Sequence, residues 1–384
     1  MRRSRPKVSY WEKTTFYRRR DVVIVGAGIV GINAAIKLKM RNPKWHVAVI
    51  DRHPIPLGGS TRNAGFACFG GPSELLADLQ SGHDDHVQKI VELRWQGLQS
   101  LRYLLGDKRI DYQHTGGHEI FRQEDESSFA ACVDQLDQLN KLFPADGPAF
   151  SLATNKELES MGLLQGFSRM IHCHLEGTLH PGLMMLELHK KATFLGVELL
   201  LGLTVTNIQS TAQAVHLRIN GQVDLPADQV IIATNGFTKQ LMPSVEVTAV
   251  RNQVIVTHPL AKVPFRGCFH YDQGYVYFRN IENRILLGGA RNKFEVDEST
   301  DQFGVNPAIV EHLIHLLREI IPEEEVVIAS QWSGILGIGA GSKMPIIEWH
   351  NDRILLACRM GGMGIAMGAK VGDLAAQRVA QVRG

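Results

Sequence analysis

The segment 26–31, with the sequence GAGIVG, has the residue types and spacing that bind a dinucleotide, and it follows a short apolar strand-like run. Glycine at the first position permits a tight turn, glycine at the third lets backbone approach a pyrophosphate, and glycine at the sixth lets the next helix pack closely. The amides at that helix start would face the phosphates. Asp51, 20 residues after Gly31, has the spacing of an acid that binds ribose hydroxyls. The pattern does not separate NAD from FAD. The predicted cofactor-binding residues are Gly26, Gly28, Ile29, Val30, Gly31 and Asp51.

A second strand–glycine–helix junction lies near the C-terminus, in RILLACRMGGMGIAMGAKVG (353–372). Its helix would begin near 361–364, and a helix start carries a partial positive charge. Reduced flavin holds negative charge near N1 and O2, so a helix start at that place would stabilise it. The two junctions therefore favour one long flavin cofactor between them. Alternatively, Gly364, Gly368 and Gly372 only give the helix a smooth face for close packing, and both explanations can hold together.

The elements that must position these junctions are spread along the chain. Its 384 residues are enough for two domains. Strand and helix patterns alternate at the start, middle and end, whereas 245–338 is mostly strand-like, with one amphipathic helix expected around 307–320. We therefore expect an α/β fold in which a Rossmann-like FAD-binding domain is interleaved with a substrate domain built on a mainly antiparallel sheet with helices. The predicted ranges are 1–20 for a basic leader, 21–105, 172–242 and 332–384 for the FAD-binding domain, and 106–171 and 243–331 for the substrate domain.

The composition limits the class of protein and its partners. A net charge of +2, with 44% hydrophobic and 21% charged residues, is ordinary for a globular protein and does not indicate nucleic-acid binding. Charge and glycine interrupt every apolar stretch before about 18 residues, so we expect no membrane-spanning helix. The basic residues of 1–20 favour a solvated leader over an arm that contacts an acidic membrane. The five cysteines form no CxxC pair and follow no secretion signal, which predicts reduced thiols in a cytoplasmic protein.

Four blocks of sequence carry a resemblance to a known family. They are VVIVGAGIVGINAA, GGSTRNAGF, GTLHPGLMMLELHKKATFLGVELL and RILLACRMGGMGIAMG. Together they resemble the FAD-dependent amine and amino-acid oxidoreductases typified by D-amino-acid oxidase, glycine oxidase and monomeric sarcosine oxidase. The chain looks most similar to the branch that contains gamma-glutamylputrescine oxidoreductase, for which STRNAG is fairly specific. The resemblance covers essentially the whole chain after the leader.

The resemblance implies FAD as the cofactor and assigns residues to it. In similar proteins the loop after the ribose-binding acid wraps the flavin, which points here to Arg52, Ser60, Thr61, Arg62, Asn63 and Gly65. A position on a surface loop is the alternative for Arg62. Val205 lies on a strand that resembles one contacting adenine, and Thr234 lies in a turn, ATNG, that matches one near the cofactor. The residues that match the flavin edge are Gly361, Gly362, Met363 and Gly364.

Three departures from the family pattern bear on chemistry. Leu286 replaces a lysine that assists the reaction with oxygen, so we expect either slow oxidase activity or a different electron acceptor. Leu336 replaces an arginine that holds the substrate carboxylate, which favours an amine or a substrate held by another group. The stretch 331–334 lacks the cysteine that tethers FAD in sarcosine-oxidase-like enzymes, so we expect non-covalent FAD.

The substrate-domain sheet covers the flavin in this family. That arrangement points to Tyr277 and Trp332 as residues that pack against substrate, with Met363 beside the flavin. Core or surface positions are the alternative for the two aromatic residues. His270 and Arg291 are further candidates.

The run IHCHLEGTLH (171–180) places His172, Cys173, His174 and His180 close together. Because His172 and His174 share one strand face and Cys173 points to the other, we expect no metal site. A lining of the active-site cavity and a plain polar face remain as explanations.

These features predict an FAD enzyme that oxidises a C–N bond of an amine or amino-acid-like substrate. A neutral amine would pass hydride to flavin N5, and the imine would hydrolyse in water. Oxygen or another carrier would accept the electrons. The alternatives are oxidation of a C–O bond in a 2-hydroxy acid or glycerol-type substrate on the same fold, a nicotinamide dehydrogenase, and a non-catalytic protein that keeps a dinucleotide as a structural element.

Overall fold

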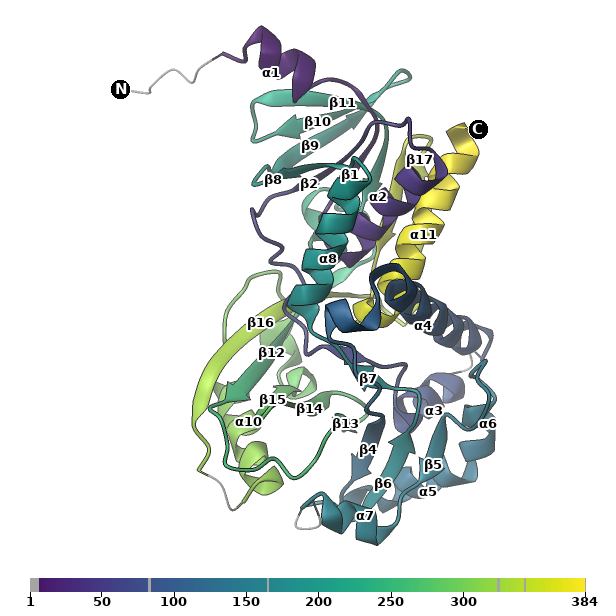
Figure 1. Ribbon diagram of the computed structural model, residues 1–384, viewed down its shortest axis with the longest axis vertical. Helices are drawn as coiled ribbons and strands as arrows, with labels where there is room; N and C mark the ends of the chain where they lie inside the picture. The colour runs from purple at the N-terminus through teal and green to yellow at the C-terminus, as the bar shows by residue number, and fades with distance from the viewer. Residues whose placement is uncertain (1–6, 82–83, 164–165, 323–324, 342, 384) are drawn as a thin grey trace.

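Two eight-stranded sheets organise the computed structural model, which describes residues 7–81, 84–163, 166–322, 325–341 and 343–383 (Figure 1). The first sheet has the order β17-β18-β11-β1-β2-β8, with β10 and β9 continuing from β11. Five of its strands, β1, β2, β8, β11 and β18, run parallel to their neighbours among these five. The strands of this sheet are β1 (Arg20–Val25), β2 (Val47–Asp51), β8 (Glu198–Leu201), β9 (Val205–Ser210), β10 (Val215–Ile219), β11 (Val223–Ile232), β17 (Ile346–Asn351) and β18 (Ile354–Cys358).

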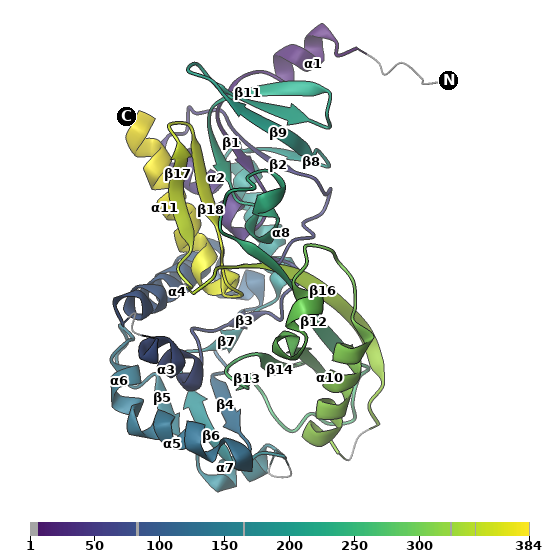
Figure 2. The same cartoon turned by 180° about the vertical axis from the view of Figure 1, so that it is seen from behind.

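Three helices cover one face of this sheet: α2 (Ile29–Arg41), α8 (Pro181–Phe194) and α11 (Gly364–Arg383), and α4 (Asp84–Leu105) packs on α11 (Figures 1 and 2). Helices α2 and α11 approach closely because glycine lies between them. A Cβ at Gly372 would lie 2.6 Å from the Val30 carbonyl oxygen, and one at Gly368 would lie 2.7 Å from Ile29 Cγ2. The glycine face predicted for the C-terminal helix is therefore used for close packing on α2.

The second sheet has the order β16-β12-β15-β14-β13-β4-β6-β5 and is antiparallel except where β4 lies parallel to β13. Helix α10 (Pro307–Ile320) buries an apolar face in the core beside it. The strands are β4 (Gly117–Phe121), β5 (Phe150–Leu152), β6 (Arg169–Cys173), β12 (Thr248–Thr257), β13 (Cys268–Tyr271), β14 (Val276–Ile281), β15 (Arg284–Gly289) and β16 (Ile328–Ile338). The remaining elements are β3 (Phe66–Ala67), which pairs with β7 (Gly177–Thr178), α3 (Pro72–Gln80), α5 (Glu126–Asp134), α6 (Leu136–Asn140), α7 (Asn155–Ser160), α9 (Glu295–Glu298), and the short 3-10 helices η1 (Asp107–Ile110), η2 (Gln123–Asp125), η3 (Asn235–Gln240) and η4 (Arg291–Lys293).

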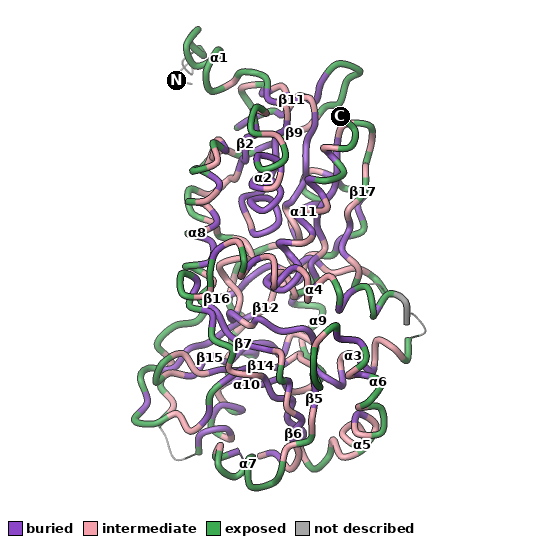
Figure 3. Tube along the Cα trace, turned by 45° about the vertical axis from the view of Figure 1, so that its right-hand side comes forward, coloured by how far each residue is buried: buried purple, intermediate pink, exposed green. Residues whose placement is uncertain are grey.

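The described part of the predicted leader projects from the first sheet (Figures 1 and 3). It begins with α1 (Tyr10–Thr15), which has no buried residue. Arg18 and Arg20 then form ion pairs with Glu198 of β8 at 2.9 and 2.5 Å, and Arg19 pairs with Asp228 at 2.5 Å. Helix α1 is thus exposed, which fits both a solvated leader and an arm that contacts a membrane, and the last three residues of the leader bind the sheet.

The predicted fold class is confirmed, since the chain forms a mixed α/β structure whose second sheet is mainly antiparallel. The two sheets also alternate along the chain. The predicted domain boundary at 331/332 lies inside β16, which pairs along its length with β12 of the second sheet, and the boundary at 171/172 lies inside β6. Among the described helices, none combines the length and the hydropathy needed to cross a bilayer.

Candidate functional site

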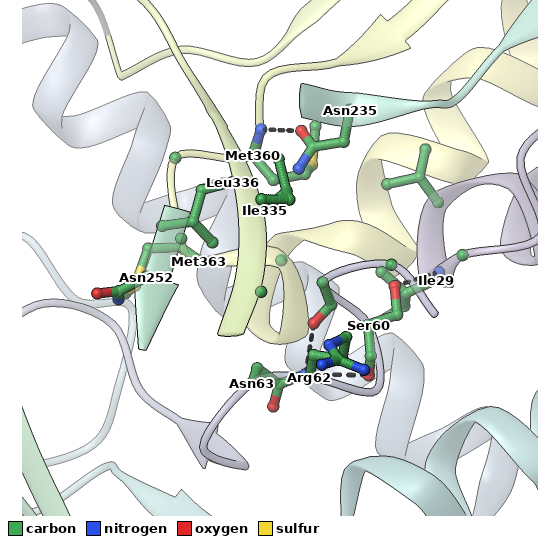
Figure 4. Close-up of a pocket in the computed structure, with 18 of the residues that line it drawn as sticks. Ile29, Ser60, Arg62, Asn63, Asn235, Asn252, Ile335, Leu336, Met360 and Met363 are labelled. Atoms are coloured by element: carbon green, nitrogen blue, oxygen red, sulfur yellow. Dashed lines mark hydrogen bonds between the residues drawn. The ribbon is translucent and has the colours of Figure 1, made fainter. Parts of the chain in front are cut away.

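A cavity of about 710 Å³ lies between the two sheets, where β1, β2, β11 and β18 end. Ligands of α/β proteins bind at this carboxyl edge, and the volume is within the range of cofactor sites. The second sheet contributes residues of β12, β13, β14 and β16 to the lining. Asn252 of β12 and Ile335 and Leu336 of β16 are labelled in Figure 4. The starts of α2 and α11 open onto this one cavity, so segments from opposite ends of the chain meet there.

The junction between β1 and α2 has the geometry expected of its glycines. Gly26 has φ +110°, and a Cβ there would lie 2.6 Å from the Ala233 carbonyl oxygen, so a larger residue would be strained and would collide. Asp51, at the end of β2, accepts the Ala27 amide at 2.9 Å. Gly31 packs against the Gly26 carbonyl behind the cavity and does not line it. The residues of this junction that do line it are Gly26, Gly28, Ile29, Val30 and Asp51.

Side-chain hydrogen bonds shape the loop after β2. Ser60 Oγ accepts the Ile29 amide at 2.9 Å and so ties the loop to the start of α2 (Figure 4). Asn63 donates to the carbonyl oxygens of Gly59 and Ser60, both at 2.9 Å, and accepts the Gly65 amide at 2.8 Å. This bonding gives the loop a fixed conformation before any ligand binds.

Not all of the predicted residues in the loop after β2 line the cavity. Arg52 stacks 4.1 Å above the Phe237 ring, and Arg62 donates to the Ser333 carbonyl, so Arg62 is held against the second sheet and is not a free surface residue. The Thr61 hydroxyl donates to a carbonyl within the loop, and Gly65 packs against backbone. Of the predicted loop residues, the cavity is lined by Arg52, Ser60, Arg62 and Asn63, and not by Thr61 or Gly65.

The C-terminal turn before α11 forms the opposite wall. Gly361 and Gly362 have φ +56° and +90°, a backbone shape that favours glycine. Asn235 Oδ1 accepts the amides of Arg359 and Met360, both at 3.1 Å, and so joins the turn after β11 to this one (Figure 4). The sequence did not single out Asn235, because its partners lie more than a hundred residues later. Of the predicted residues, those from the C-terminal half that line the cavity are Val205, Thr234, Gly361, Gly362, Met363 and Gly364.

Tyr277 and Asn252 form a polar pair in the part of the cavity next to the second sheet, which we call the substrate end. The Tyr277 hydroxyl accepts the Asn252 amide at 3.1 Å, and burial raises the pKa of Tyr277 well above its ordinary value. Asn252 Oδ1 is buried and has no hydrogen-bond partner among the described residues. An orphaned buried acceptor is costly, so this atom is suited to an N–H or O–H donor of a bound molecule.

Trp332 does not line the cavity, which corrects the expectation that it packs against substrate. Its indole N–H donates to the Arg62 carbonyl at 3.1 Å, and its ring packs in the cluster that contains Leu286. Trp332 therefore supports the loop after β2. Leu286 is 2% exposed and does not line the cavity either, whereas Leu336 does.

Ion pairs border the substrate end, and the sequence indicated only one of their members. His270 lines the cavity, and its Nε2 lies 2.8 Å from Glu176 Oε2. Burial opposes protonation of His270, but the Glu176 carboxylate outweighs it and raises the pKa of the imidazole. Lys343 pairs with Glu74 and with Asp78, both at 2.9 Å. Burial raises the pKa of Glu74, but Arg94 and Lys343 outweigh it and lower that pKa to about 2.

The histidines of 171–180 lie outside the cavity lining. His172 Nδ1 is 3.1 Å from His118 Nδ1, and His172 Nε2 is 3.3 Å from a Glu157 oxygen. These contacts favour the polar-face explanation. A different group in the described residues, Cys68, Glu176 and His270, brings possible metal-ligand atoms within 4.8 Å of one another.

The sequence profile of the DAO family, described as FAD dependent oxidoreductase, matches residues 21–378. The chain belongs to this family. The probable oxidoreductase OrdL of Haemophilus influenzae is 22% identical over 386 residues, which cover 94% of this chain and 82% of OrdL. The DAO-family assignment makes the chain an FAD-dependent oxidoreductase and confirms the predicted cofactor and enzyme class.

Solved structures share this DAO-family fold at low sequence identity. Glycine oxidase from Geobacillus kaustophilus matches with a TM-score of 0.73 and 20% identity, covering 94% of this chain and 95% of that one. L-proline dehydrogenase from P. horikoshii matches with 0.73 and 16%, covering 95% and 94%. L-alpha-glycerophosphate oxidase from Mycoplasma pneumoniae, with FAD bound, matches with 0.75 and 15%, covering 94% and 95%.

The cavity fits the cofactor of the DAO family. At Gly26 the surrounding backbone excludes a Cβ, and two helix starts face one space. A long ligand with negatively charged phosphates fits both features. The residues that would hold FAD are Gly26, Gly28, Ile29, Val30 and Asp51, with Arg52, Ser60, Arg62 and Asn63 of the loop after β2 and residues 361–364 of the turn before α11.

Proposed function

We propose that this enzyme oxidises a C–N bond of an amine or amino-acid-like substrate at the substrate end of the cavity. The observation that carries the proposal is the protonation of the groups there. Burial raises the pKa of the Tyr277 hydroxyl well above its ordinary value, and Glu176 raises the pKa of His270, so both groups favour their protonated forms. Oxidation of an alcohol needs a base to take the hydroxyl proton, whereas a neutral amine needs none.

In this proposal the chain orients the substrate, and FAD supplies the acceptor for two electrons. An N–H of the neutral amine donates to Asn252 Oδ1, which otherwise has no partner among the described residues. Tyr277 accepts the Asn252 amide and so fixes which way that side chain faces. The imine product then leaves and hydrolyses in water to a carbonyl compound and ammonia or an amine.

The same proposal extends to the finer features of the family resemblance. The STRNAG loop supports membership of the branch that contains gamma-glutamylputrescine oxidoreductase. The absence of a cysteine from 331–334 supports non-covalent FAD. All five cysteines are buried and free of disulfides, which supports reduced thiols and a cytoplasmic location. The FAD-binding domain would comprise 21–105, 172–242 and 332–384, with 106–171 and 243–331 forming the substrate domain, except that β6 and β16 belong as whole strands to the substrate-domain sheet.

Anaerobic mixing with paired compounds tests the proposal. Each pair consists of an amine and the alcohol of the same carbon skeleton, and bleaching of the flavin's visible absorbance reports oxidation. The proposal expects bleaching by amines and none by their alcohols. Bleaching by the alcohols alone would replace it with C–O oxidation. Subsequent admission of air measures how fast oxygen restores the absorbance, and slow recovery would support a different electron acceptor.

A further inference from the structure

Arg291 provides a positive charge at the substrate end that no carboxylate of the described residues neutralises. It is the first residue of η4, it is half-buried, and it lines the cavity. Its guanidinium carbon lies 5.0 Å from the centre of the Tyr275 ring. In the described part of the chain, Arg291 makes no ion pair and its side chain makes no hydrogen bond. All five of its N–H donors are therefore left for a ligand.

The other charged groups at the substrate end compensate one another. Lys343 pairs with two carboxylates, those of Glu74 and Asp78, and Glu74 also pairs with Arg94 at 3.3 Å. His270 pairs with Glu176. Arg52 and Arg62 also lack an ion pair among the described residues, but Arg52 donates to Gln240 and Arg62 to the Ser333 carbonyl, whereas the Arg291 guanidinium has no such partner there. An uncompensated, partly buried cation favours an anionic group in the ligand.

The backbone places Arg291 over the substrate end by an unusual turn. Strand β15 ends at Gly289, and Ala290 follows with φ +61°, in the left-handed region that non-glycine residues rarely adopt. The Ala290 amide donates to the Tyr275 carbonyl at 2.8 Å. This turn directs Arg291 back across Tyr275, where the ring stacks on the guanidinium and restricts its orientation. Such strain in a non-glycine residue is common at functional sites.

We propose that Arg291 binds the carboxylate of an amino-acid-like substrate. In related enzymes an arginine on the strand that corresponds to β16 holds the carboxylate, and here that position is Leu336. Arg291 would bind the carboxylate instead, from η4, which follows β15. A guanidinium can hold a carboxylate through two parallel hydrogen bonds, which fixes the orientation of the ligand as well as its affinity. The inference rests on the proposed function, because it names the substrate class of that site as amines that carry a carboxylate.

Ligand binding to the FAD-loaded protein tests Arg291 without turnover. Benzoate, benzyl alcohol and phenyl phosphate are titrated, and the change in the flavin's visible spectrum reports binding. We expect benzoate to bind, and R291M to weaken it about 10- to 150-fold, the loss of hydrogen bonds to a charged group. R291K keeps the positive charge but lacks the two parallel N–H donors of a guanidinium, so its affinity for benzoate should lie between those of R291M and the wild type. The control K293M removes a charge from the same short helix at an exposed position outside the cavity lining and should match the wild type.

Several results would overturn the proposal. Equal benzoate affinity in R291M and wild type would remove Arg291 from the subsite, as would failure of benzoate to bind the wild type at all. Binding of phenyl phosphate but not benzoate would assign the charge to a phosphate. If R291M fails to retain FAD, the benzoate affinities of R291K and R291Q are compared with that of the wild type instead.

Kinetics separate this inference from the proposed function. Each amino acid is compared with the amine that has hydrogen in place of its carboxylate. R291M should lower kcat/KM for the amino acid about 10- to 150-fold and leave the decarboxylated amine nearly unchanged. An equal loss for both would show that the charge acts on the flavin instead. If no amine bleaches the flavin, the proposed function fails, while the benzoate titration still decides the role of Arg291.

Discussion

His270 Nε2 lies 2.8 Å from Glu176 Oε2, and the two residues are only 6% and 2% exposed. This pair connects β13 to the segment before β7, across the wall of the cavity. Because Glu176 raises the pKa of His270, proton binding to the imidazole stabilises the folded state. The stabilisation is fully present below the unfolded pKa of about 6.5 and is lost as the pH rises through the folded pKa.

We therefore predict that E176Q is less stable than the wild type by about 1–3 kcal/mol near pH 6. The difference in the free energy of unfolding should shrink as the pH rises, since the imidazole then loses its proton in both proteins. Urea unfolding at a series of pH values measures it. The control E311Q changes an exposed carboxylate of α10. A difference that grows with pH would contradict the assignment of His270 as the protonated partner.

Gly28 permits a test of cofactor binding that leaves the fold intact. Its φ of −75° suits any residue, and a Cβ there would lie 3.0 Å from Ser60 Oγ, a contact that needs only a small shift. G28A should therefore keep the stability of the cofactor-free protein within about 0.5 kcal/mol. It should raise the Kd for FAD about 10- to 100-fold, because a methyl group would separate the backbone amides from the pyrophosphate. Fluorescence titration of the cofactor-free protein with FAD measures the Kd.

The control for this variant is G166A, at a glycine outside the cavity lining whose Cβ would have room. Unchanged FAD affinity in G28A, with normal unfolding, would show that the pyrophosphate does not lie against this turn.

The fold was largely predictable because its signals are local. Helix α10 has the bounds Pro307–Ile320, which its apolar periodicity gave directly, and the two glycine junctions lie where their spacing placed them. The parallel pairing of β4 with β13 could not be predicted, since these strands are about 150 residues apart and carry no pairing signal in their own residues. Tertiary pairing of this kind is decided by packing and not by propensity.

The site was only partly predictable for the same reason. Asn235, Asn252 and Glu176 act through partners distant in sequence, and each is an ordinary polar residue in its own segment. Trp332 illustrates the opposite error. A large aromatic residue near a cofactor strand suggested substrate contact, but its N–H bonds to the Arg62 carbonyl and its ring supports the loop after β2.

The contact between α2 and α11 should be sensitive to a single methyl group. At Gly372 a Cβ would lie 2.6 Å from the Val30 carbonyl and 2.8 Å from the Ala34 amide nitrogen, and both are backbone atoms that cannot move alone. G372A should lower the free energy of unfolding by about 1–3 kcal/mol through overpacking, despite the better helix propensity of alanine. It should also weaken FAD binding, because α2 would move with its glycine junction. Thermal unfolding and FAD titration measure the two effects, with Q377A, at an exposed position of α11, as the control. Normal stability would mean that the helices are not in this close contact.

Tyr277 should act as a neutral hydrogen-bonding group throughout the usual assay range. Burial raises the pKa of its hydroxyl well above that of a free phenol, so the group keeps its proton throughout that range. Y277F should lower kcat/KM about 10-fold, because the Asn252 amide loses its acceptor and Asn252 Oδ1 is no longer held toward the substrate. The shape of the pH profile should stay the same in Y277F, and Y103F, at a tyrosine that is 95% exposed, should match the wild type in both respects. A wild-type profile with an alkaline limb that disappears in Y277F would show that Tyr277 does give up its proton. The hydroxyl would then be a candidate base, and the main argument for an amine over an alcohol substrate would fail with it.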